Sequence, residues 1–447
     1  MTVSQRVPQA APSSASDIPT RKIARRLIPF LCLLYFFAYL DRFNIGFASI
    51  TMNQDLGLSM AAYGFAASMF FVGYILFEVP SNIVLGKVGA RLWITRIMVT
   101  WGLVSAATIF TRGPGSLAGL RLLLGAAEAG FLPGIVVYLS QWFPHEERSG
   151  AMGMFQTAMP LAGVLGSPVS ALILTHMHGV SGLPGWKWLF LIQGLPSVAL
   201  GLSCLWLLPS RPAEAKWLTD AQRASLERKL EAERRATEAG GHVSLRQVFV
   251  EPRVVMLAVL LFCLICGSTG IGFFLPQIVK DFGFSTVKIG MVTAIPYLAS
   301  VVGMVLWSRF ANHKDDRIRY VAIPTVLAGC GFLLAACSLH TPVVAVIGLS
   351  VACVGIFSTF PVYFTLPQTF LTGTSAAAAI AFVNSVGNIS GVVEPAFIGW
   401  TRDVSGGFTF MLFILAGLMA VALVLCWRFA AMVRSGAVAS PLKRQSV

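Results

Sequence analysis

Long apolar runs separated by short polar connections make up most of this chain. Twelve of these runs are mostly apolar over about 18 residues or more. A helical run of ~20 residues, rising ~1.5 Å per residue, crosses a ~30 Å hydrocarbon core. We therefore predict twelve membrane-spanning helices and an all-α integral membrane protein. The approximate limits of the spans are 27–50, 60–86, 92–110, 115–140, 149–175, 187–208, 253–280, 284–308, 318–338, 342–366, 374–400 and 407–429.

The longest polar stretch divides the predicted spans into six and six. Its charged middle, KWLTDAQRASLERKLEAERRATEAGG, predicts a surface helix that starts near Asp220 and stops at Gly240-Gly241. A linker on the membrane surface is its simplest role, and regulation or partner binding is the alternative. Two six-helix halves match the parallel repeats of a large transporter class, whose substrate binds near the midplane. We expect a disordered cytoplasmic tail at 1–20, a six-helix bundle at 21–208, a cytoplasmic linker at 209–252, a second six-helix bundle at 253–430 and a cytoplasmic tail at 431–447.

Composition and charge agree with a membrane protein. Of the 447 residues, 56% are hydrophobic and 12% are charged, whereas soluble domains are nearer a quarter charged. The net charge of +14 could suggest nucleic acid, but the cytoplasmic segments would hold 26 Lys and Arg and the opposite face 5. This positive-inside asymmetry explains the charge without a nucleic-acid partner. We expect a multi-pass protein of the cell inner membrane, with no signal peptide and both termini in the cytoplasm.

Four charged residues lie inside two of the predicted spans: Asp41 and Arg42 in the first, and Arg121 and Glu128 in the fourth. A charge at the centre of a membrane helix costs at least ~2.5–3.5 kcal/mol, so these side chains should face an interior cavity. At ~1.5 Å per residue, Asp41 lies ~21 Å from the cytoplasmic edge and Arg121 ~9 Å from the opposite edge. The two depths coincide in a ~30 Å core, which predicts a single cluster.

The charges of this cluster suggest how an anion and protons could move together. Asp41, Arg42, Arg121 and Glu128 sum to zero when all are ionised. An anionic substrate would make the site negative, and a proton on either acid would offset that charge and free an arginine. Arginine suits a carboxylate because its planar fork donates two parallel hydrogen bonds. The alternative is that Asp41–Arg42 and Arg121–Glu128 are salt bridges that only join helices, although apolar replacements would usually serve stability as well.

Aromatic and amide side chains in several spans add candidate substrate contacts, with ordinary helix packing as the alternative. Glu78 and Glu394 lie in further spans and would add negative charge. No cluster resembles a nucleophile–base pair or a metal site, so we expect neither an enzyme nor a metal or cofactor, with protons as the coupling ion. The candidate contacts are Tyr39, Tyr74, Tyr363, Asn384 and Asn388.

Several segments carry a family resemblance. LDRFNIGFA, FEVPSNIVLGKVGAR, RLLLGAAEAGFLPGIVVYLSQWFP, GWKWLFLIQGLP and AFVNSVGNISG resemble the anion:cation symporter family of the major facilitator superfamily, over roughly residues 22–430. Family members include bacterial permeases for tartrate, phthalate, hydroxyphenylacetate, hexuronates and galactonate. The resemblance implies the major facilitator fold, in which two six-helix bundles rock around a midplane site.

The resemblance also implies roles for individual residues. Asp41 and Glu128 match the family's proton-carrying acids. Arg42 and Arg121 match its substrate-linked arginines. The remaining matches are to pocket residues of the two halves, namely Tyr39, Tyr74, Asn388 and the neighbouring Asn384.

Four departures from the family pattern bear on function. The loop after the second span has Asn82 and Gly86 where the superfamily motif has Gly and Asp, and Gln193 stands where Glu is usual. Glu394 replaces a usual Gly, which makes it a candidate additional acid or the partner of a basic residue. Met159 aligns with a Gln of the sugar-acid members and favours a less hydroxylated ligand.

These observations favour a proton-coupled symporter that takes up a small organic anion, an aromatic or dicarboxylic acid, and works as a monomer in the bilayer. An efflux antiporter for lipophilic compounds is one alternative, and the paired intramembrane arginines argue against it. A ligand-sensing transceptor that signals through the linker is another, and ligand binding without uptake would favour it.

Overall fold

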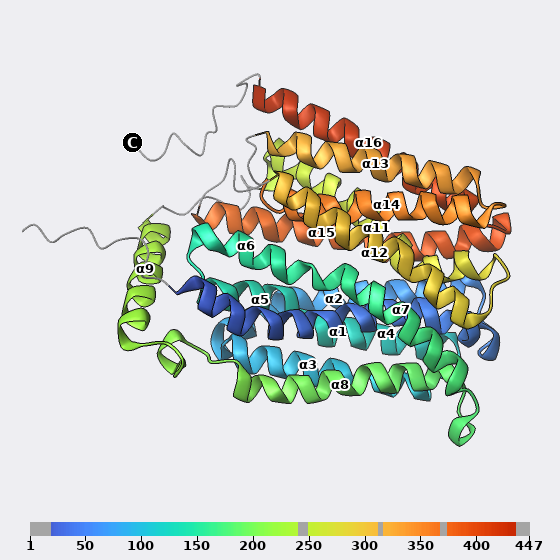
Figure 1. Ribbon diagram of the computed structural model, residues 1–447, viewed down its shortest axis with the longest axis horizontal. Coiled ribbons are helices and arrows are strands. Elements are labelled where there is room, and N and C mark those ends of the chain that lie inside the picture. The colour runs from blue at the N-terminus through green and yellow to red at the C-terminus, as the bar shows by residue number, and fades with distance from the viewer. Residues whose placement is uncertain (1–18, 240–248, 312–315, 367–372, 435–447) are drawn as a thin grey trace, which may run out of the picture.

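The computed structural model describes residues 19–239, 249–311, 316–366 and 373–434, and this part of the chain is helices and short connections (Figure 1). The expected tails lie mostly outside the described residues. Eleven described segments are long and apolar enough to cross a membrane. The helix at the predicted span 374–400 is not among them, but it packs along two of the others, α2 and α11. The main helices are α1 (Thr20–Asp55), α2 (Met60–Val88), α3 (Ala90–Ala107), α4 (Pro114–Glu128), α5 (Phe131–Ser140), α6 (His145–Gln156), α7 (Ala158–His176), α8 (Gly185–Leu207), α9 (Asp220–Ala239), α11 (Pro252–Lys280), α12 (Thr286–Ala311), α13 (Arg317–Cys337), α14 (Pro342–Tyr363), α15 (Gly373–Ser405) and α16 (Thr409–Arg434).

The helices form two bundles that lie side by side (Figure 1). In the N-terminal half, α3 packs on α8 and α2 on α4, while α1 contacts α7 and α8. In the C-terminal half, α13 packs on α14 and α16, and α11 contacts α15 and α16. Three helix pairs join the halves, namely α1 with α11, α2 with α15 and α7 with α12. The interior between the halves is therefore built from α1, α2 and α7 on one side and α11, α12 and α15 on the other.

The predicted span 115–140 is interrupted after Glu128. α4 ends there and α5 begins at Phe131, with Gly130 at φ 87°, a conformation that glycine adopts without a steric penalty. Pro133 has no N–H to donate to the carbonyl of Ala129, four residues earlier. The hydroxyl of Ser81 on α2 donates to that carbonyl instead, at 2.6 Å. The break is thus satisfied from a neighbouring helix, as broken membrane helices require.

A second proline interrupts the predicted span 149–175. α6 ends at Gln156 and α7 begins at Ala158. Pro160 cannot donate to the carbonyl of Gln156, so a continuous hydrogen-bond ladder is lost at this point. Each broken helix still counts as one span, because its two parts together are long and apolar enough to cross the membrane.

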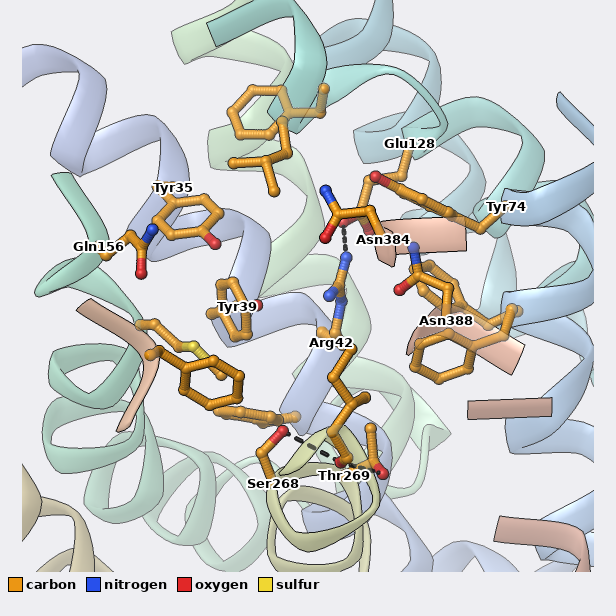
Figure 2. A pocket seen from close by; sticks show the side chains of 18 of the residues that line it. Tyr35, Tyr39, Arg42, Tyr74, Glu128, Gln156, Ser268, Thr269, Asn384 and Asn388 are labelled. Carbon is orange, nitrogen blue, oxygen red and sulfur yellow. Dashed lines mark hydrogen bonds and ion pairs between the residues drawn. The ribbon is translucent and has the colours of Figure 1, made fainter. Parts of the chain in front are cut away.

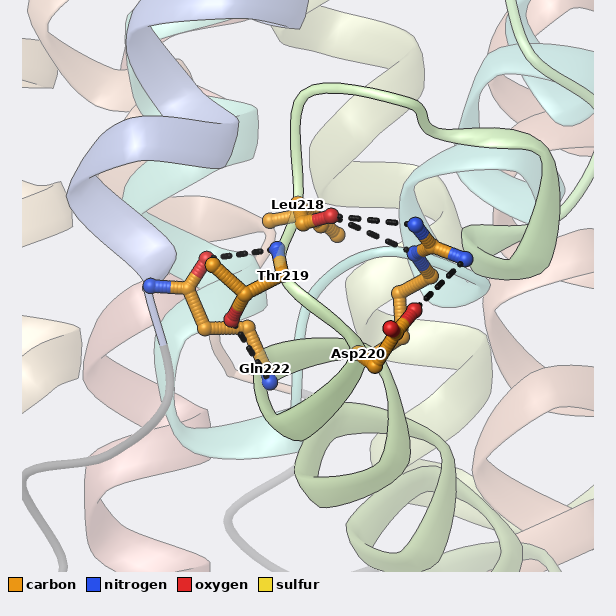
Figure 3. A network of polar contacts seen from close by, with 5 residues as sticks. Leu218, Thr219, Asp220 and Gln222 are labelled. Carbon is orange, nitrogen blue, oxygen red and sulfur yellow. Dashed lines mark hydrogen bonds and ion pairs between the residues drawn. The ribbon is translucent and has the colours of Figure 1, made fainter.

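The predicted surface helix of the linker is present as α9, which begins at Asp220 as expected. Figure 3 shows its start, where Thr219 and Gln222 form a reciprocal capping box. The Thr219 hydroxyl accepts from the Gln222 N–H at 3.3 Å, and the Gln222 side chain accepts from the Thr219 N–H at 3.2 Å. The predicted stop, Gly240-Gly241, lies outside the described residues. α9 lies across one end of the bundles, which we call the α9 end (Figure 1).

Tight contacts join the two halves at the opposite end, the distal end, which includes the end of α1, the start of α2 and the end of α11. Lys280 Nζ donates to the carbonyl of Ile50 at 2.8 Å, and the Tyr63 hydroxyl donates to the carbonyl of Phe273 at 3.1 Å. Gly46 of α1 lies so close to the backbone of α11 that an added Cβ would meet the Gly272 carbonyl at 2.9 Å. Close backbone approach through small residues is typical of packed membrane helices.

Asp403 of α15 caps α2 across the interface between the halves. Its carboxylate accepts from the backbone N–H groups of Met60, at 3.0 Å, and Ala61, at 2.7 Å. These N–H groups have no partner within their own helix, and the start of a helix carries partial positive charge. Gly399, one turn before Asp403, lies against the Met60 carbonyl, where a side chain would collide. This cap holds the distal end closed.

We predict that Asp403→Ala loosens the distal end. Hydrogen bonds to charged groups contribute about 1.5–3 kcal/mol, so losing this cap should favour separation of the halves by roughly tenfold or more. Hydrogen exchange of the first turn of α2 should become faster in the variant. Asp316→Ala, which removes an acid next to α13 at the α9 end, is the matched control and should leave that exchange unchanged. Equal protection in Asp403→Ala and the unmodified protein would contradict the capping role.

Candidate binding site

Arg42 of α1 and Glu128 of α4 form an ion pair within the N-terminal half, on its side that faces the other half (Figure 2). The Arg42 guanidinium carbon also lies 4.9 Å from the ring centre of Tyr39 and 5.0 Å from that of Phe70. Both rings attract the cation electrostatically. The Arg42 Nε is buried without a hydrogen-bond partner among the described residues. The guanidinium is therefore held in place by Glu128 and two rings, and it keeps an unused donor.

The break between α4 and α5 fixes the position of Glu128. Glu128 is the last residue of α4, directly before the turn at Gly130. Gly125, one turn earlier, lies against the Phe70 carbonyl of α2, and an added Cβ would collide with it. This glycine lets α4 approach α2 closely, and the approach brings Glu128 and Phe70 to the same guanidinium.

Asp41 and Arg121 belong to a separate, fully buried network. The Asp41 carboxylate accepts from the Trp101 indole N–H at 2.7 Å, from the Asn44 amide at 2.8 Å and from the Ser105 hydroxyl. The Arg121 guanidinium donates to the Asn44 side-chain oxygen at 3.5 Å. Asn44 therefore bridges the second acid to the second arginine.

The four charges are not paired as Asp41–Arg42 and Arg121–Glu128, the two salt bridges considered from the sequence. Arg42 pairs with Glu128, and Asp41 lies with Arg121. Neighbouring residues on a helix point about 100° apart, so Asp41 and Arg42 face different helices. Residues seven apart share a face but lie ~10.5 Å apart along the axis, so Arg121 and Glu128 do not touch. The expected meeting of the first and fourth spans is observed, because Arg42 on α1 reaches Glu128 on α4.

The Arg42–Glu128 pair lines a cavity of about 100 Å³ between the halves. Its wall comes from α1, α2, α4, α5, α6 and α7 of one half and α11, α14 and α15 of the other. The residues of the distal contacts lie beyond the cavity along α1, α2, α11 and α15, so the cavity is closed on that side.

The structure brings six of the candidate residues to this cavity. Asp41 and Arg121 do not line it, because they are buried in the separate network that Asn44 joins. Tyr363 also lies elsewhere, because its hydroxyl donates to the Leu257 carbonyl at 2.6 Å inside the C-terminal half. The six that line the cavity are Tyr39, Arg42, Tyr74, Glu128, Asn384 and Asn388.

Glu394 lies directly behind the cavity wall in the C-terminal half. One carboxyl oxygen accepts from the Thr269 hydroxyl at 3.0 Å, and Thr269 lines the cavity. The other oxygen is buried without a partner among the described residues. No basic side chain forms a salt bridge with it in the described part of the chain, so the alternative of a basic partner receives no support.

Several cavity residues were not singled out from the sequence. Glu78 was noted only for its charge, yet it lines the cavity. Gln156 lies three residues before Met159, on the same side of the interior, and this spacing could have indicated it. Ser268 and Thr269 lie in an apolar part of α11, and their hydroxyls donate to backbone carbonyls of the same helix. Serines and threonines that bond in this way are common in helices, so nothing in the sequence indicated a binding role.

A protein-family comparison matches residues 31–395 to the model of the Major Facilitator Superfamily. A protein of Agrobacterium vitis named "Putative tartrate transporter" is 45% identical over 91% of this chain and 90% of its own length. A "Quinolone resistance transporter" of Acinetobacter baumannii is 39% identical over 91% of this chain and 94% of its own length.

A solved structure shares the fold. The xylose transporter XylE from E. coli aligns with a TM-score of 0.74 and 14% identity, over 91% of this chain and 98% of its own. The predicted all-helical major facilitator fold is confirmed, and relatives that are named transporters agree with the expectation that the protein is not an enzyme. The chain therefore belongs to the Major Facilitator Superfamily and is a multi-pass membrane transporter.

Proposed function

We propose that this transporter takes up a small organic anion, an aromatic or dicarboxylic acid, together with protons by alternating access. The observation that carries the proposal is the Arg42–Glu128 ion pair in the cavity wall. An ionised Glu128 occupies Arg42, whereas a proton on Glu128 leaves the guanidinium free for a carboxylate. Proton binding and anion binding then favour each other, and this coupling is reciprocal.

The other polar residues have supporting roles in this proposal. Asp41 is a second proton site, and Arg121 balances its charge through Asn44. Glu394, linked to the cavity through Thr269, is a candidate additional acid. The substrate contacts are Arg42 together with Tyr39, Tyr74, Asn384 and Asn388.

We further propose that the α9 end faces the cytoplasm of a cell whose inner membrane holds the protein as a monomer. The uneven distribution of Lys and Arg, 26 against 5, supports this orientation and places both termini inside. The distal contacts then close the outer side, and the conformation described here is one whose cavity is shut towards the outside.

The first test removes the guanidinium. Arg42→Ala should weaken binding of a transported carboxylate by about 10- to 100-fold, because charge-assisted hydrogen bonds contribute about 1.5–3 kcal/mol. Arg42→Lys keeps the charge without the planar fork and should be intermediate. Isothermal titration of the purified protein measures both. Unchanged affinity in Arg42→Ala would remove Arg42 from the substrate site.

The second test removes the exchangeable proton. Glu128→Gln and Asp41→Asn should lose pH-driven accumulation in proteoliposomes, because an amide does not release a proton at neutral pH. Both should retain some exchange of internal for external substrate. Glu231→Gln, on the exposed face of α9, is the control and should accumulate substrate normally. Normal pH-driven accumulation in both site variants would show that neither acid couples protons to transport.

Efflux of lipophilic compounds is the second candidate, and the 39% identity to a quinolone resistance transporter favours it. The same proteoliposomes separate the two functions. Uptake requires that an inward proton gradient drive a carboxylate into the proteoliposomes. Efflux requires that a quinolone move in the direction opposite to the protons. Quinolone transport without carboxylate transport would replace the uptake proposal.

A further inference from the structure

The cavity offers a single positive charge to a ligand. Among the described residues that line it, Arg42 is the only cation. Arg121 is 3% exposed, and its charge is balanced by Asp41 through Asn44. Two acids, Glu78 and Glu128, also line the cavity. One carboxylate can therefore be matched by Arg42, and a second would meet no cation.

The charge balance disfavours a ligand with two carboxylates even after proton uptake. With a proton on Glu128, the remaining lining groups that can carry charge are Arg42 and Glu78, which has no ion-pair partner among the described residues. If Glu78 is neutral, a monocarboxylate balances Arg42 and a dicarboxylate leaves one net negative charge; if Glu78 is ionised, each total is more negative by one. A buried charge without a counter-charge or hydrogen-bond partners is strongly disfavoured.

The remaining wall suits an aromatic ring. Ten of the 21 lining residues are Phe or Tyr. Tyr39 and Phe70 flank the Arg42 guanidinium, so a ring attached to the bound carboxylate would continue between aromatic side chains. Stacked and edge-on aromatic pairs contribute beyond the area that they bury. A compact, hydroxyl-rich aliphatic acid would add no ring to these aromatic contacts.

Neutral hydrogen-bonding groups complete the cavity on the side of the C-terminal half. Asn384 and Asn388 are one turn apart on α15, and Figure 2 shows both beside the Arg42–Glu128 pair. Ser268 and Thr269 of α11 lie at the opposite edge of the same view. Amides and hydroxyls can bind a phenol-type hydroxyl or a ring nitrogen, but they do not neutralise a carboxylate.

Resting on the proposed uptake function, we infer that the cavity selects an aromatic monocarboxylate with a neutral polar substituent over dicarboxylates. Arg42 holds the carboxylate, the aromatic side chains surround the ring, and Asn384 or Asn388 binds the substituent. A second carboxylate would meet no cation, and Glu78 would repel it whenever Glu78 is ionised.

The test compares matched ligands by isothermal titration of the full-length protein at one pH. 4-Hydroxybenzoate and terephthalate differ only in a hydroxyl or a second carboxylate at the far end of the ring. We expect 4-hydroxybenzoate to bind at least about tenfold more tightly than terephthalate or tartrate, the size of effect that leaving one charged group unpaired produces. Equal or tighter binding of terephthalate or tartrate would overturn the inference.

Three variants assign the selectivity to residues. Glu78→Gln should raise terephthalate affinity severalfold relative to 4-hydroxybenzoate, because it removes the charge that Glu78 carries when ionised. Asn384→Ala and Asn388→Ala should each lower the affinity for 4-hydroxybenzoate more than the affinity for benzoate, because benzoate has no hydroxyl for the amides to bind. Ligand preferences that stay as in the unmodified protein in all three variants would refute the assignment.

The proposed function and its selectivity can fail separately. If pH-driven uptake of tartrate occurs without binding of 4-hydroxybenzoate, the selectivity is wrong and the uptake function stands. If none of the four acids binds and none is taken up, both proposals fall.

Discussion

Charges placed in a low-dielectric interior must be compensated there, and this constraint organises the core of the protein. Arg42 is held by Glu128 and two aromatic rings, and Asp41 lies with Arg121 through Asn44. Removing one partner of a buried pair leaves an isolated charge, which is far more costly than the pair is stabilising. In the proposed transport function, a proton or a substrate carboxylate would take the place of the missing partner.

Breaks and close contacts in the backbone determine where these charged side chains lie. α4 ends at Glu128 because Gly130 and Pro133 interrupt the helix, and Ser81 of α2 satisfies the carbonyl that the break exposes. Gly125 allows α2 and α4 to approach until the aromatic ring of one helix and the acid of the other meet the same guanidinium. Helix breaks and glycines therefore act here as positioning elements for the ion pair.

The cavity and the distal contacts lie at different depths of the interface between the halves. On α1, α2 and α15, the residues that line the cavity lie nearer the α9 end than the residues of the distal contacts do. The cap of Asp403 on α2 lies at the end of the helices, and the Arg42–Glu128 pair lies nearer their middle. In the proposed uptake cycle, the distal contacts would open and close access to the cavity, and the buried charges would couple transport to protons.

The sequence by itself determined the membrane class, most helix limits to within a few residues, the linker helix starting at Asp220 and the presence of buried acids and arginines. These features depend on local composition, because a continuous apolar run has no other stable environment. The sequence did not indicate the helix breaks after Glu128 and Gln156, nor that α1 extends over Thr20–Asp55. The tertiary structure alone decided which acid meets which arginine, that Tyr363 lies outside the cavity and that Arg42 is the one guanidinium facing it among the described residues. Pairing and access depend on the rotation and approach of helices far apart in sequence, set by contacts such as Gly125 with Phe70 that no single segment encodes.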